Sequence, residues 1–86
     1  MKFGIYAIRD AFTGFLTPTF DLNDQVAKRN FAYAIKQKNS LLYSNAQDYD
    51  LYKIGEFDQD SGVISPLDHH QLICTGLSVK ESVDHV

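Results

Sequence analysis

The residues best suited to bind a metal ion lie in the second half of the chain. Asp58-Gln59-Asp60-Ser61-Gly62 has the oxygen-rich composition of a calcium loop. An EF-hand loop needs a glycine at position six and a glutamate at position twelve. Counted from Asp58, the glycine stands at position five and His69 at position twelve. Because turn formers dominate this segment, we expect a hairpin turn that holds no metal.

His69, His70 and Cys74 are the other candidate ligands or nucleophiles. Adjacent histidines point in opposite directions on a strand, and no cysteine or carboxylate stands at a spacing that would complete a tetrahedral site. Cys74 follows Leu72 and Ile73, which predicts a buried strand residue. A single cysteine excludes an internal disulfide and is typical of a reducing compartment. We therefore expect no metal, no cofactor and no thiol catalysis.

Motifs for other kinds of catalysis are absent from the sequence. The five glycines are scattered and form neither a dinucleotide-binding nor a Walker pattern, and no serine stands in G-x-S-x-G. We expect the chain not to be an enzyme and to act by binding.

One helix carries the residue pattern that best fits a ligand. Gln25, Arg29, Tyr33 and Lys36 recur at i, i+4, i+8 and i+11, and Lys28 flanks them. A tyrosine between cations on an exposed face suits single-stranded nucleic acid, because the ring stacks on a base while the cations contact phosphates. We name Lys28, Arg29, Tyr33 and Lys36 as candidate nucleic-acid-binding residues. The alternative is an ordinary solvated helix face.

The helix that must position these residues is predicted over 23–37. Asn23 is a good N-cap, and Lys36 and Lys38 suit the negative end of the helix dipole. Apolar residues at helical spacing form the buried stripe: Ala27, Phe31, Ala34 and Ile35.

Two hairpins are predicted to flank this helix. In the first, a strand over 2–9 turns at 10–14 into an extended stretch over 15–20, which Pro18 places at a sheet edge. The residues of the first strand alternate between two apolar faces, with Phe3, Ile5 and Ala7 on one and Gly4, Tyr6 and Ile8 on the other.

The second hairpin joins strands over 51–57 and 63–67, and Pro66 is expected to end it. Segment 72–77 is a candidate fifth strand, and 41–50 is expected to be a loop with one helical turn near 45–48.

These elements predict an α+β fold, in which a small antiparallel sheet of two hairpins, with a candidate fifth strand, packs one amphipathic helix on one face. We expect a single domain over 1–77 and a polar tail over 78–86 that frays. The uncovered sheet face is expected to carry aromatic residues such as Tyr6 and Tyr52. A partner or a second copy could bury it, so we expect a homo-oligomer.

Composition and charge limit the kinds of partner. The 86 residues are 44% hydrophobic and 22% charged, which favours a folded chain, and no apolar run approaches the length of a membrane span. The net charge of −3 argues against coating nucleic acid by charge alone. Residues 1–40 carry six cations and three carboxylates, whereas residues 41–86 carry two cations and eight carboxylates. This asymmetry fits a nucleic-acid face with an acidic counterweight, or head-to-tail self-association.

The second hairpin also resembles a family signature, L-Y-x-I-G-x-F-D-x-x-T/S-G-x-I, over Leu51-Tyr52-Lys53-Ile54-Gly55-Glu56-Phe57-Asp58-Gln59-Asp60-Ser61-Gly62-Val63-Ile64. It is similar to the small non-structural protein of gokushovirus-type microviruses, which are single-stranded-DNA bacteriophages. The first strand, the segment 14–20 with its proline and the helix with Ala27-Lys28-Arg29-x-Phe31 also match that family's layout, so the resemblance covers about 2–77.

The resemblance implies a DNA-binding-type accessory protein in the host cytoplasm, with single-stranded DNA and phage replication or capsid proteins as partners in genome synthesis or packaging. The alternative is a self-associating, scaffold-like module without nucleic-acid contact. On neither hypothesis do we expect a membrane partner.

Overall fold

Strand β1 organises the sheet in the computed structural model, which describes residues 1–81. β1 (Lys2–Asp10) pairs on one side with two short strands and on the other with β4, which in turn pairs with β5; every pairing is antiparallel. The remaining strands are β2 (Gly14–Phe15), β3 (Thr19–Asp21), β4 (Tyr49–Asp58) and β5 (Ile64–Thr75). The sheet order is β2-β1-β4-β5, with β3 beside β1.

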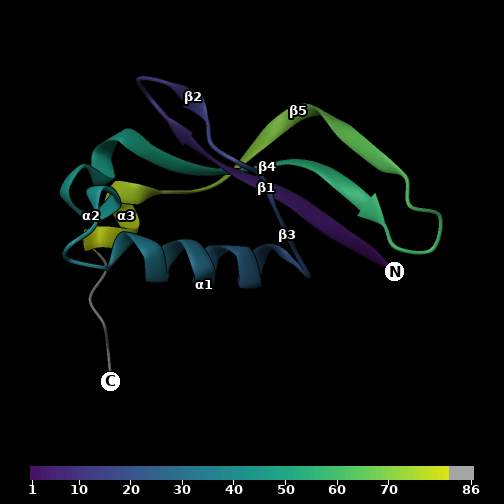
Figure 1. Ribbon diagram of the computed structural model, residues 1–86, viewed down its shortest axis with the longest axis horizontal. Coiled ribbons are helices and arrows are strands. Elements are labelled where there is room, and N and C mark those ends of the chain that lie inside the picture. Colours follow the sequence, from purple (N-terminus) through teal and green to yellow (C-terminus); the bar gives the residue numbers. More distant parts are fainter. Residues whose placement is uncertain (82–86) are drawn as a thin grey trace.

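All the helices lie on the same side of this sheet (Figure 1). They are α1 (Asp24–Ile35), α2 (Leu41–Ser44), the 3-10 turn η1 (Ala46–Asp48) and α3 (Gly76–Glu81). Asn23 caps α1 as predicted, because its side chain accepts a 2.9 Å hydrogen bond from the Val26 amide. Within the described residues no helix is both long and apolar enough to cross a membrane. An α+β fold with a helix packed on an antiparallel sheet is therefore confirmed.

The hydrophobic core lies between the helices and the sheet. Three of its buried residues, Ala27, Phe31 and Ile35, come from the predicted stripe of α1. The strands and the short helices supply the others, which are Tyr6, Ala46, Leu51 and Val79. Ala34, also predicted in the stripe, is half-buried. Helical periodicity therefore located the main packing surface of α1.

The prediction that Pro66 ends a strand is wrong. The segments predicted as 63–67 and 72–77 belong to one continuous strand, β5, and Pro66 pairs with Gly55 inside it. The β4–β5 register then jumps from Gly55/Pro66 to Lys53/Gln71, which leaves 67–70 as a large bulge. A sheet edge interrupted by a bulge tolerates a proline, since the missing amide donor is not needed there.

The prediction of a frayed tail from residue 78 is wrong for 78–81. These residues continue α3, and Val79 is only 5% exposed in the core. Gly76 makes this packing possible, because a Cβ at that position would collide with the carbonyl oxygens of Ala46 and Tyr49. The rest of the predicted tail, 82–86, lies outside the described residues.

The expectation that Tyr6 lies on the uncovered face is also wrong. Tyr6 pairs with Lys53 on the helix side and is 1% exposed, whereas Tyr52 pairs with Ala7 on the opposite side. The two alternating sets of β1 residues are as predicted. Both are apolar, however, so alternation alone could not determine which set faces the helix.

Candidate nucleic-acid interface

Three of the four predicted binding residues share the outer side of α1. At about 100° per residue, Arg29, Tyr33 and Lys36 fall within an arc of about 60°, opposite Phe31. Tyr33 is 71% exposed, Arg29 is exposed and Lys36 is half-buried. The helix ends at Ile35, with Lys36 as its C-cap, so the expected cations follow the last turn instead of lying within it.

Lys28, the fourth predicted residue, lies apart on the flank of α1. It lines a hollow between the helix and β5 together with Gln25, Gln71 and Ile73. Burial raises the pKa of the Cys74 thiol above its ordinary value, and the positive charge of Lys28 partly offsets this rise. The structure therefore brings Arg29, Tyr33 and Lys36 together and directs Lys28 toward the sheet edge.

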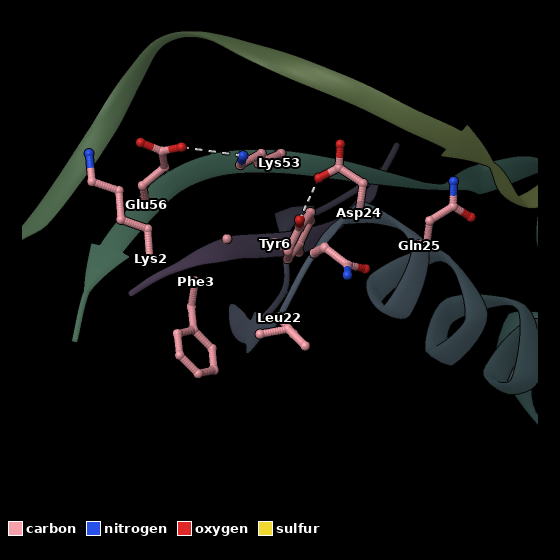
Figure 2. Close-up of a pocket in the computed structure, with 10 residues that line it drawn as sticks. Lys2, Phe3, Tyr6, Leu22, Asp24, Gln25, Lys53 and Glu56 are labelled. Atoms are coloured by element: carbon pink, nitrogen blue, oxygen red, sulfur yellow. Dashed lines mark hydrogen bonds and ion pairs between the residues drawn. The ribbon is translucent and has the colours of Figure 1, made fainter.

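A larger hollow of about 500 Å³ lies at the N-terminal end of α1 (Figure 2). Within it the Tyr6 hydroxyl donates a 2.5 Å hydrogen bond to Asp24. Burial raises the pKa of the Tyr6 phenol, and Asp24 raises it further through this hydrogen bond and its charge. Lys53 and Glu56 also line the hollow, and the Lys53 ammonium lies 3.5 Å from the Glu56 carboxylate.

This hollow is poorly suited to anions. Its charged lining alternates cations, Lys2 and Lys53, with the carboxylates Asp24 and Glu56. Asp24 already stands in the first turn of α1, where a bound anion would otherwise interact with the helix dipole. We therefore assign the hollow no ligand.

The sheet side opposite the helices carries an exposed apolar surface. Phe15 packs edge-on against Tyr52 and His70, with ring centroids 5.8 and 5.2 Å apart, and Phe20 packs edge-on against Phe57 at 5.5 Å. Ile64 pairs with Phe57 and is 60% exposed. We call this surface the open sheet face and define it by these residues: Phe15, Phe20, Tyr52, Phe57, Ile64 and His70.

The open sheet face contains an apolar groove of about 260 Å³ between β3, β4 and β5. Two prolines, Pro18 and Pro66, line it together with Phe20, Ile54 and Ile64. Of the residues that define the open sheet face, only Tyr52 was expected on the uncovered face from the sequence. The others could have been found by extending the alternation of β1 across its strand partners, but the register needed for that step is set by the tertiary fold.

A family model described as Phage ORF5 protein matches residues 3–79. The chain belongs to the Phage ORF5 family. The match runs from β1 into α3, so both α1 and the open sheet face lie inside it. The chain is thus a bacteriophage protein, which confirms the phage part of the resemblance seen in the second hairpin. No curated protein and no solved structure matches this Phage ORF5 protein.

Proposed function

We propose that this Phage ORF5 protein is a non-enzymatic accessory protein of a gokushovirus-like microvirus. It binds single-stranded DNA in the host cytoplasm during genome synthesis or packaging, together with phage replication or capsid proteins. The DNA contacts are Arg29, Tyr33 and Lys36 on the outer side of α1, with Lys28 on its flank.

The observation that supports this proposal best is the position of Tyr33. It is 71% exposed on a well-capped helix and has a cation about one turn away on either side. An exposed aromatic ring can stack on a base of any sequence, and flanking cations neutralise the adjacent phosphates. Such a face binds single strands in preference to duplex, whose bases are already stacked.

Charge makes the expected affinity modest. The chain has a net charge of −3, and two or three cations can contact phosphates at this face. Affinity for single strands falls with a log–log salt slope of about −0.7 per phosphate neutralised. We expect a slope of roughly −1.4 if Arg29 and Lys36 act alone, and about −2 if Lys28 takes part.

A second candidate function is a protein-interaction module that does not contact nucleic acid. The open sheet face favours it, because this surface is apolar and exposed on the side away from the helices. The acidic net charge fits it as well. On this hypothesis Tyr33 is an ordinary surface residue.

A fluorescence titration separates the two candidates. Labelled single-stranded and duplex oligonucleotides are titrated with the protein at low and at physiological salt, with Tyr33→Ala as the matched variant. DNA binding predicts single-strand preference, the salt slope above and weaker binding by Tyr33→Ala. No affinity for any oligonucleotide at low salt overturns it in favour of the second candidate.

A further inference from the structure

The open sheet face is nearly neutral as well as apolar. Strand pairing places two charged side chains on it, Arg9 and Asp50, which are register partners of each other across β1 and β4 among the described residues. Arg9 also stands opposite Phe15 on β2. One cation beside one carboxylate is a poor match for a phosphate backbone, which needs several cations.

The same charge pattern is complementary to itself. When two copies face each other across a two-fold axis, any contact made by one is repeated by the other. With the axis running along the seam between β1 and β4, Arg9 of one copy faces Asp50 of the partner. The aromatic rings and Ile64 of the two copies then pack together in the interface. A neutral apolar face bearing one charge of each sign therefore fits a second copy of this chain.

The size of the face is adequate for a stable dimer. The long strands β1, β4 and β5 have 9, 10 and 12 residues, and β2 and β3 add 2 and 3. At a rise of about 3.3 Å per residue and a strand spacing of about 4.8 Å, they present roughly 600 Å² in projection. The uneven surface of the side chains and the groove make the accessible area larger than this projected area. Each partner in a standard protein interface buries about 800 Å².

We propose that this Phage ORF5 protein forms a two-fold symmetric homodimer in which the open sheet faces pack against each other. The dimer has four layers, with the two sheets inside and the helices outside. Both copies of α1 then face solvent on opposite sides. If α1 binds DNA as proposed above, one dimer binds two single-stranded segments, which suits a role in compacting a genome. The dimer itself does not depend on that function.

Sedimentation velocity without DNA tests the dimer. Wild type, Ile64→Lys and the control Leu41→Lys are compared over a range of concentrations. Ile64 lies on the open sheet face and Leu41 on α2, and the two are 60% and 74% exposed, so neither change disturbs the core. We expect wild type and Leu41→Lys to dimerise. Ile64→Lys should weaken dimerisation about 100-fold or more, because symmetry buries two uncompensated ammonium groups.

A monomeric wild type at tens of micromolar overturns the proposal. A dimer that Ile64→Lys leaves intact overturns the assignment of its interface. A second pair of variants tests the contact between Arg9 of one copy and Asp50 of the other. Arg9→Asp should weaken the dimer, and the double variant Arg9→Asp/Asp50→Arg should restore it. If the double variant does not restore the dimer, Arg9 and Asp50 do not face each other across the interface. Because no DNA is present, failure here is distinct from failure of DNA binding.

Discussion

The hydroxyl of Tyr6, on β1, donates a 2.5 Å hydrogen bond to the carboxylate of Asp24 in the first turn of α1. This contact fixes the start of the helix to the middle of the sheet. Tyr6→Phe keeps the buried ring and removes only the donor, so we expect a loss of about 1 kcal/mol in the free energy of unfolding. Urea unfolding measures it, with Tyr33→Phe as an exposed control. Equal stability of Tyr6→Phe and wild type would show that the bond contributes nothing net.

The same contact predicts a loss of stability at alkaline pH. Burial, followed by Asp24, raises the pKa of Tyr6 above its ordinary value of 10.0. The folded state therefore favours the protonated phenol, and its stabilising effect is complete below pH 10 and declines as the pH rises above that value. The free energy of unfolding should fall as the pH rises above 10, and it should fall more steeply for wild type than for Tyr6→Phe. Parallel curves for the two proteins would contradict this.

Phe31 and Tyr33, two residues apart on α1, should separate stability from binding. Phe31 is 3% exposed in the core and Tyr33 is 71% exposed. Phe31→Ala should cost about 3–5 kcal/mol of stability. Tyr33→Ala should change stability by less than about 0.5 kcal/mol and weaken binding to single-stranded DNA by about 1–3 kcal/mol. Thermal melts and the oligonucleotide titration measure the two effects, and unchanged affinity in Tyr33→Ala would leave Tyr33 without a binding role.

Gly76 should tolerate no side chain. A methyl group there meets the backbone oxygens of Ala46 and Tyr49, neither of which can move away without shifting η1 or β4. We expect Gly76→Ala to lower stability by about 2 kcal/mol or more. Leu77→Ala is the control, because Leu77 is 45% exposed on the same helix. A neutral Gly76→Ala would mean that α3 does not dock as described.

Local patterns in the sequence identified the elements that depend on local physics. The N-cap Asn23 and the spacing of Ala27, Phe31 and Ile35 identified α1 and its buried side. The turn-forming residues of 58–62 located the tip of the second hairpin, where the Asp58 carboxylate accepts a 2.9 Å hydrogen bond from the Asp60 amide. Capping, helical periodicity and turn chemistry each need only a few neighbouring residues.

The features that the sequence did not reveal depend on contacts distant along the chain. Pro66 ends a strand in most local contexts, but the edge position and the bulge of β5 accommodate it. Val79 is buried because Gly76 lets α3 approach η1, which lies some thirty residues earlier in the chain. Tyr6 was expected on the wrong face for the same reason, since either side of β1 could have packed on the helix.

Photocross-linking shows directly whether single-stranded DNA lies on the outer side of α1. Wild-type protein is irradiated with an oligonucleotide containing a photoreactive thymine analogue, and the adduct is located by mass spectrometry. We expect an adduct at Tyr33 that high salt abolishes and that Tyr33→Ala removes. Adducts at Phe15 or Tyr52 of the open sheet face, with none on α1, would contradict it.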